Sequence, residues 1–219
     1  MSPRPQNSLP RASNHYFSSD TGRLSPEEQG RAPVLSVEVD GVQLQFLTGA
    51  NTFSKSALDE GSQLLVETLW KHGDFPDKAR VCDLGCGWGA VGAMWATLNP
   101  GHLIFALDVN PRAVQLAGLN FARNALENAV AWCGDGLGAA RSEFFDLVAF
   151  NPPIRAGNAT IERLFADAHR TLKPGGELWA VIRTAQGAKT WAKKLERVFG
   201  CCETVEMRAG YRILKATKC

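Results

Sequence analysis

The chain has 219 residues, of which 45% are hydrophobic and 21% charged, and its formal net charge is +2 at pH 7. This composition is typical of a globular protein, no apolar run is long enough to span a membrane, and the start of the chain lacks the apolar core of a signal peptide. We therefore exclude a membrane protein and expect a cytoplasmic one, and the small net charge by itself gives no argument for nucleic acid.

The first part of the chain is rich in Pro, Ser, Arg and Asn and has few apolar residues. Such a segment buries too little apolar surface to fold alone, so we interpret residues 1–33 as a flexible N-terminal arm and residues 34–219 as one domain. Within residues 34–48, apolar and polar side chains alternate on both sides of Asp40-Gly41. Asp-Gly between two alternating runs predicts a small β-hairpin.

An amphipathic helix is predicted over residues 56–72, with Ser54 or Ser56 as its N-cap. Gly61 interrupts this helix near its start. Because glycine weakens a helix, its presence indicates that a neighbouring element or a ligand approaches closely at that point.

A strand, a glycine-rich turn and a helix follow one another next. The strand covers residues 80–84, the turn is Gly85-Cys86-Gly87-Trp88-Gly89, and the helix continues to about Leu98. Glycines allow the backbone to approach a ligand closely, and the start of a helix offers free N–H groups. This arrangement is typical of nucleotide binding.

The following strand, at residues 103–107, ends in Asp108. An acid at the end of this strand accepts hydrogen bonds from both hydroxyl groups of a ribose, which together with the glycine turn predicts an adenosine-containing cofactor. The alternative is that Asp108 caps the next helix. Asn110 fits the capping role better, because Pro111 follows it at the first helical position.

The six cysteines show no paired spacing, which argues against a zinc site and against a disulfide framework, so we expect no metal. Cys82 and Cys86 flank the junction between the strand and the glycine turn, and we expect both to be buried as small apolar side chains. The cysteines are Cys82, Cys86, Cys133, Cys201, Cys202 and Cys219.

The rest of the chain alternates between strands and helices, which indicates a mostly parallel, doubly wound α/β sheet of the Rossmann-like kind. The last two strands follow each other without a helix, so we predict seven strands that end in a C-terminal antiparallel hairpin. Asp135, after the third strand, either accepts a hydrogen bond from an adenine amino group or is a turn residue. We predict helices at 111–126, 159–172 and 188–199, and strands at 130–133, 145–150, 177–182, 204–207 and 211–216.

Asn151-Pro152-Pro153 ends the apolar strand 145–150 abruptly. Two prolines prevent further sheet pairing and stiffen the backbone at the carboxyl end of a strand, where open α/β sheets bind ligands. Proline removes backbone donors and leaves carbonyl acceptors. The amide oxygen of Asn151 and the carbonyl of Pro152 therefore offer two acceptors that suit a planar NH₂ group. The simpler alternative is a strand followed by a proline-stiffened turn.

The segment 83–89, Asp108 and Asn151-Pro152-Pro153 together resemble the signature of class I S-adenosylmethionine-dependent methyltransferases that act on exocyclic amines. Further segments resemble the short, single-domain members of the RsmC-like ribosomal RNA (guanine-N2) methyltransferases. The resemblance covers about His15 to Lys218, and these further segments are Phe53-Ser54-Lys55, 58–62, 151–157, 176–179 and 210–213.

The resemblance implies a methyl transfer to the N2 amine of guanine, in which Asn151 and Pro152 accept the two amine hydrogens. It also implies ribosomal RNA or the small ribosomal subunit as the partner, and we expect a monomer. Related enzymes often have an aromatic residue after the two prolines to stack on the base; here Ile154 stands there, so stacking must come from elsewhere or be replaced by aliphatic contact. We expect the cofactor S-adenosylmethionine to be held by Asp83, Gly85, Cys86, Gly87, Asp108, Val109, Asp135, Gly136 and Asn151, and the substrate by Phe53, Asp59, Pro153, Ile154 and Arg155.

Other functions remain open from the sequence. A protein glutamine-N5 methyltransferase would use the same two acceptors, although its relatives usually have tyrosine after the prolines. A nicotinamide-dependent oxidoreductase would account for the glycine turn, but Asn-Pro-Pro and the closing hairpin argue against it. A module that binds RNA without chemistry is disfavoured because both motifs are intact.

Overall fold

The computed structural model describes residues 23–48 and 58–219, and residues 1–22 and 49–57 lie outside the described part. Its centre is a sheet of seven strands in the order β5-β4-β3-β6-β7-β9-β8. β9 runs antiparallel to both of its neighbours, β7 and β8, and the other neighbouring strands are parallel, which confirms the predicted fold class. The strands are β3 (Arg80–Leu84), β4 (Leu103–Asp108), β5 (Ala129–Cys133), β6 (Phe145–Phe150), β7 (Leu172–Arg183), β8 (Glu203–Arg208) and β9 (Tyr211–Thr217).

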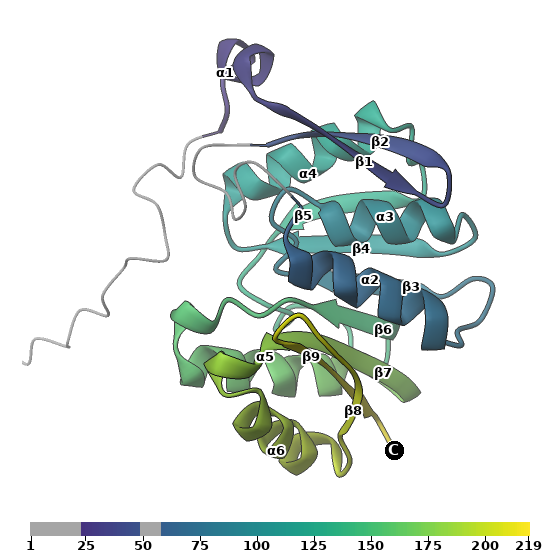
Figure 1. The fold of residues 1–219 in the computed structure, drawn as a ribbon, viewed down its shortest axis with the longest axis vertical. Helices are drawn as coiled ribbons and strands as arrows, with labels where there is room; N and C mark the ends of the chain where they lie inside the picture. Colours follow the sequence, from purple (N-terminus) through teal and green to yellow (C-terminus); the bar gives the residue numbers. More distant parts are fainter. Residues whose placement is uncertain (1–22, 49–57) are drawn as a thin grey trace, which may run out of the picture.

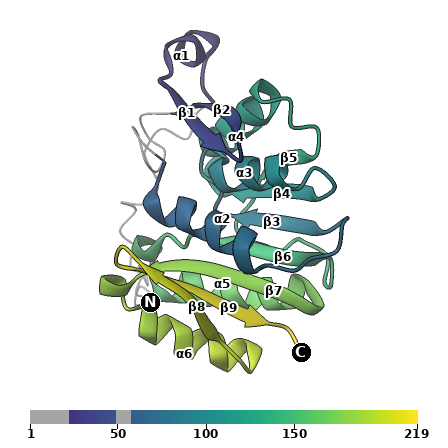
Figure 2. The same cartoon turned by 45° about the vertical axis from the view of Figure 1, so that its right-hand side comes forward.

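Helices cover both faces of this sheet (Figures 1 and 2). α2 (Glu60–His72), α3 (Ala90–Leu98) and α4 (Pro111–Arg123) pack on one face, and α5 (Asn158–Thr171) and α6 (Ala188–Phe199) pack on the other. Each face therefore has its own apolar cluster, built around Leu65 and Trp179 under α2 to α4 and around Phe150 and Phe165 under α5 and α6. Because successive strand residues point to opposite faces, β6 and β7 supply side chains to both clusters.

A separate two-stranded hairpin, β1 (Val34–Val39) and β2 (Val42–Leu47), is confirmed at its predicted place. Asn120 of α4, whose side chain is fully buried, fastens it to the body of the domain. Its Oδ1 accepts from the Leu47 N–H at 2.7 Å, and its Nδ2 donates to the carbonyls of Leu47 and Trp88. One amide thus joins the hairpin, α4 and the glycine turn.

A short helix that the sequence did not predict, α1 (Pro26–Arg31), lies within the expected arm. Glu28 pairs with Arg112 of α4 at 2.6 Å, and the Leu24 N–H donates to Oε1 of Gln115. The bond from the Ser25 backbone N–H, helped by Arg112, lowers the pKa of Glu28 to about 2. The end of the expected arm is therefore attached to α4, and the flexibility of its earlier residues stays a prediction.

The predicted starts of two elements are wrong, and α4 ends at Arg123 and not at residue 126. α2 begins at Glu60 because Asp59, not Ser54 or Ser56, is its N-cap. β7 begins at Leu172 and not at residue 177, because Lys173-Pro174-Gly175-Gly176 forms a bulge within the strand instead of a loop before it. Phe145 and Leu147 of β6 face Leu172 and Glu177, and the bulge is held by the tail of β9 through the bonds of Lys218.

Among the residues that the structure describes, no helix is long and apolar enough to cross a membrane. The same residues contain no group of three or more His, Cys, Asp or Glu side chains that could hold a metal ion. Cys82 and Cys86 are buried and free, as the sequence predicts.

Candidate active site

The glycine turn lies at the carboxyl end of β3 and is held against β4. The N–H groups of Gly85 and Cys86 both donate to the Leu107 carbonyl, at 2.8 and 2.9 Å. Gly85 and Gly87 have φ angles of 69° and 56°, which favour glycine. A Cβ atom built on Gly87 meets nothing within 4 Å, so the backbone there borders open space that a ligand can enter.

Asp108 stands at the end of β4 beside this turn. Its Oδ2 accepts from the Gly87 N–H at 2.9 Å and its Oδ1 from the Asn110 N–H at 2.8 Å. Burial raises the pKa of this carboxyl above its usual range. Each carboxylate oxygen has a second lone pair, so both can still accept from a ribose hydroxyl. The capping role falls to Asn110, whose side chain accepts from the Arg112 N–H, as predicted.

Asp83 lies deeper, below the turn, and is only 3% exposed. Its Oδ2 accepts from the Gly92 N–H of α3 at 2.8 Å, which ties the helix to β3. Burial, with a smaller effect from the charge of Asp108, raises the pKa of Asp83 to about 7. The structure thus gives Asp83 a positioning role, and its direct contact with a cofactor stays a prediction.

Three more of the expected cofactor residues are Asp135 and Gly136, in the loop after β5, and Val109, directly after β4. Asp135 is paired with Arg163 of α5 at 2.6 Å, and its contact with adenine stays a prediction. Gly136 has a φ of 72°, and a Cβ on it would lie 2.5 Å from Leu164, so close packing against α5 requires glycine there. Val109 is 37% exposed next to Asp108, at the edge where a ligand would lie.

Asn151 directly follows β6 and is oriented by α2. Its Nδ2 donates to Oδ2 of Asp59 at 2.9 Å and to Oγ of Ser62 at 3.0 Å. Because a carboxylate can only accept, the NH₂ group must face Asp59, and the amide oxygen is turned to the other side. Within the described part of the chain, no donor is bonded to this oxygen or to the Pro152 carbonyl. Both predicted acceptors are therefore available within the described part, and the NH₂ group of Asn151 is held by two side chains.

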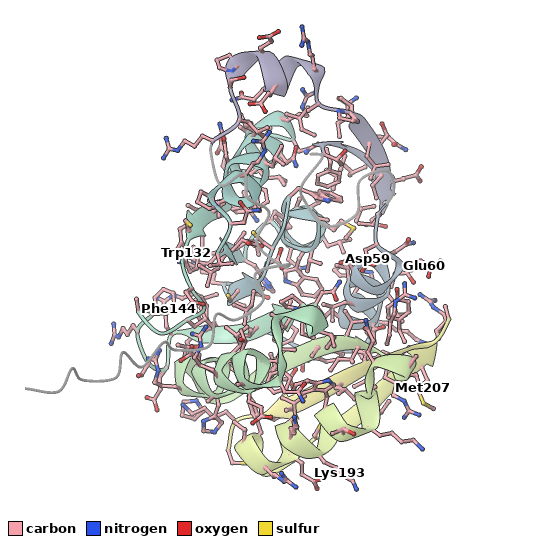
Figure 3. The ribbon with its side chains drawn as sticks, turned by 90° about the vertical axis from the view of Figure 1, so that its left-hand side faces the viewer. Asp59, Glu60, Trp132, Phe144, Lys193 and Met207 are labelled. Atoms are coloured by element: carbon pink, nitrogen blue, oxygen red, sulfur yellow. The ribbon has the colours of Figure 1, made fainter. Side chains whose placement is uncertain are left out.

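Asp59 has two tasks at the start of α2, where Figure 3 shows it beside Glu60. Its Oδ2 accepts from the Ser62 N–H at 2.9 Å, which caps the helix, and the same oxygen holds Asn151. Tyr211 of β9 explains why a glycine stands at position 61 in the first turn of this helix. A Cβ on Gly61 would lie 2.9 Å from the tyrosine ring. The close neighbour predicted at Gly61 is confirmed, and contact of Asp59 with a substrate stays a prediction.

The residues after Asn151 turn back into the domain. Pro152 is buried, and the Pro153 carbonyl accepts from the Ala156 N–H at 2.7 Å to open the short helix η1 (Ile154–Ala156). Ile154 is partly buried and packs against the apolar cluster under α5 and α6. Phe53 and the side chain of Arg155 lie outside the described part of the structure.

The structure brings together, at the carboxyl ends of β3, β4 and β6, the glycine turn, Asp108 and Asn151. It adds Ser62, which the sequence analysis did not single out because its contact with Asn151 spans 89 residues. A glycine turn beside a strand-end acid, with two acceptor oxygens at the end of the neighbouring strand β6, is the arrangement of a class I S-adenosylmethionine-dependent methyltransferase.

The comparisons with known proteins agree with this class. The family model described as "Methyltransferase small domain" matches residues 43–215. The uncharacterized protein YbxB of Bacillus subtilis is 32% identical over 208 residues, which cover 94% of this chain and 99% of that protein. The ribosomal RNA large subunit methyltransferase G of Klebsiella pneumoniae is 31% identical over 202 residues, which cover 89% of this chain and 52% of that protein.

Among solved structures, the 16S rRNA N2 G1207 methyltransferase (RsmC) of T. thermophilus, in complex with AdoMet and guanosine, is similar with a TM-score of 0.75. The identity is 26%, and the match covers 85% of this chain and 50% of that one. The chain thus spans about half the length of the ribosomal RNA methyltransferases that it matches. It belongs to the methyltransferase small domain family.

Proposed function

We propose that this protein transfers a methyl group from S-adenosylmethionine to the N2 amine of a guanine in ribosomal RNA, with small-subunit RNA as the first target to test. The observation that carries the proposal is the orientation of Asn151. Because Asp59 and Ser62 take both hydrogens of its NH₂ group, its oxygen is left to accept from a substrate.

The N2 amine of guanine is a weak nucleophile because its lone pair is delocalised into the ring. Asn151 Oδ1 and the Pro152 carbonyl would each accept one amine hydrogen and favour a pyramidal nitrogen with a directed lone pair. The same acceptors stabilise the positive charge that develops on nitrogen. Positioning of the two reactants supplies up to roughly 7–11 kcal/mol of such a barrier. The product ammonium loses its proton readily, so no strong general base is required.

The open space beside the Gly87 backbone and the two carboxylate oxygens of Asp108 fit the adenosine part of the cofactor. Bound there, S-adenosylmethionine supplies a methyl group activated on a sulfonium. A base inside a duplex could not reach an acceptor pair at a strand end, so the target guanine must be unpaired or flipped.

A protein glutamine amide is the second candidate, since any planar NH₂ group fits two acceptors. The two relatives described above whose names state an activity are ribosomal RNA methyltransferases, and they favour RNA. The match covers only about half of each of these two methyltransferases, so we transfer their RNA target to this chain as a proposal.

Nucleoside mass spectrometry tests the proposal. Ribosomal RNA from a strain that lacks the gene is incubated with the purified protein and S-adenosylmethionine, beside a glutamine-containing protein as the second substrate. We expect N2-methylguanosine in the RNA and no methyl group in the protein. Methylation of the protein alone, or of another nucleoside, would refute the proposed acceptor.

A further inference from the structure

Arg183 is the last residue of β7, at the same carboxyl edge of the sheet as Asn151, and it is exposed. It pairs across the strands with Tyr211 at the start of β9. Its guanidinium carbon lies 4.6 Å from the centroid of the Tyr211 ring. The two planar groups are therefore in contact, and the arginine is the outer one.

The sheet register places Arg183 on the same face as Asn151. β6 and β7 are parallel, with Phe150 opposite Ala180, and both of these side chains belong to the cluster under α5 and α6. Since side chains alternate along a strand, Asn151 and Arg183 both point to the other face, toward α2. Arg183 is three residues beyond Ala180, which at about 3.3 Å per residue places it beyond the end of β6, on the same side of the sheet edge as Asn151.

The neighbouring residues confirm this alternation. Ala149 of β6 and Trp179 and Val181 of β7 pack in the cluster under α2, and these are the residues that alternate with Phe150 and Ala180. Asn151 itself bonds to Asp59 and Ser62 of α2. The turn between β8 and β9 lies next to the start of α2 (Figures 1 and 2). Tyr211 is the first residue of β9, directly after this turn.

The ring of Tyr211 is a rigid platform on which the Arg183 guanidinium rests. Its side chain is 4% exposed, and its ring packs against the Cα of Gly61, where a methyl group would lie only 2.9 Å away. Burial, together with the charge of Asp59, raises the pKa of its phenol, so the ring is neutral at neutral pH. A neutral aromatic face attracts a guanidinium, which leaves the second face of the guanidinium toward the open edge of the sheet.

We propose that the guanidinium plane of Arg183 stacks on the guanine base that presents its amine to Asn151. This inference rests on the proposed function and names the surface that holds its substrate. Arginine planes stack on unpaired bases much as aromatic rings do. Ile154, which stands where related amine methyltransferases have an aromatic residue, packs instead into the cluster under α5 and α6. Arg183 on Tyr211 supplies a planar surface on the Asn151 side of the sheet.

The test compares two substitutions that separate planarity from charge. Arg183→Ala removes both, and Arg183→Lys keeps the charge but loses the plane. We expect both to lower kcat/KM for ribosomal RNA by about 10- to 100-fold, the usual effect of one lost stacking contact. The affinity for S-adenosylhomocysteine and the melting temperature should stay unchanged, since Arg183 is exposed and lies on the acceptor side.

Arg141→Ala is the matched control, because Arg141 is an exposed arginine shortly before β6, at the opposite edge of the sheet. It should methylate RNA at the wild-type rate. An Arg183→Lys variant with wild-type kcat/KM would mean that only charge matters and would overturn the inference, as would a fully active Arg183→Ala variant. A wild-type protein that forms no N2-methylguanosine would instead overturn the proposed function, and the inference with it.

Discussion

The two halves of the candidate site are built in different ways. The cofactor half, at the ends of β3 and β4, consists mainly of backbone groups and glycines, with Asp108 bonded to N–H groups of the turn. The acceptor half, which we propose binds the substrate at the ends of β6 and β7, consists of side chains that come from α2, β6, β7 and β9. The cofactor half is thus determined by a short local sequence, whereas the acceptor half exists only once distant segments have come together.

This difference in construction suggests that the two halves have separate functions, cofactor binding and catalysis. Substitutions in the backbone half should mainly change cofactor affinity, and substitutions in the side-chain half should mainly change turnover. The following predictions test this division, from the largest expected effect to the smallest.

Asn151→Ala should lower turnover about 10²–10³-fold, the usual cost of one lost electrostatic contact in a transition state. Cofactor affinity and melting temperature should barely change, and Pro152→Ala should be milder because the carbonyl remains. Asn151→Asp should not rescue activity, since it would place a second carboxylate where Nδ2 now lies 2.9 Å from Asp59. Single-turnover methylation of ribosomal RNA measures this; a variant that keeps near-parent turnover would refute the role of Asn151.

Asp108→Ala should weaken S-adenosylmethionine binding by roughly 2–4 kcal/mol, because charge-assisted bonds to the ribose are lost. Calorimetry with the purified protein measures the affinity, and a melting curve reports any loosening of the Gly87 turn. Asp74→Ala, an exposed acid in the loop after α2, is the control and should bind normally. Unchanged affinity in Asp108→Ala would remove this residue from the cofactor half.

Asp83 predicts a dependence of stability on pH. Its pKa rises from 3.8 to about 7 on folding, so the folded state binds more protons than the unfolded state between these values. The free energy of unfolding therefore falls as pH rises through this window, by up to about 1.4 kcal/mol per pH unit. Asp83→Asn keeps an acceptor for Gly92 and should gain stability relative to wild type from pH 4 to pH 7. Thermal unfolding at several pH values measures the difference in unfolding free energy between the variant and the wild type. A difference that stays constant with pH would contradict the prediction.

Asp59→Ala should have the smallest effect and should affect both stability and turnover. Loss of the N-cap of α2 costs about 0.5–2 kcal/mol of stability. Loss of the bond that orients Asn151 should lower turnover by about tenfold, the value of roughly one hydrogen bond. Asp59→Asn keeps an acceptor and should be closer to wild type in both. If Asp59→Ala lost stability alone, the link from α2 to Asn151 would have no catalytic importance.

Much of the cofactor half could be predicted from the sequence, because strand, glycine turn and strand-end acid are consecutive signals. The same holds for Asn110, whose capping role follows from Pro111 after it. The acceptor half could be predicted only as far as Asn151 and Pro152. The bond between Asp59 and Asn151 joins residues 92 positions apart, and no local pattern reports such a contact. Gly61 gave the one usable signal, since its cost to the helix indicated a neighbour, which is Tyr211.

The bulge at the start of β7 was missed for a similar reason. Pro174-Gly175-Gly176 has the composition of a loop, and the residues are held in the sheet by Lys218 at the far end of the chain. α1 was missed because its polar sequence, with no buried residue, resembles a solvated tail. Its attachment depends on Arg112 of α4, which lies 84 residues from Glu28.

The central claim is that the oxygen of Asn151, oriented by α2, accepts from the substrate amine. A crystal structure of the protein with S-adenosylhomocysteine and guanosine tests it most directly. We predict that Asn151 Oδ1 and the Pro152 carbonyl each lie within about 3.2 Å of the guanine N2, with Nδ2 of Asn151 still bonded to Asp59. A guanine bound elsewhere, or an Asn151 amide that leaves Asp59 and faces the base with its NH₂ group, would contradict the claim.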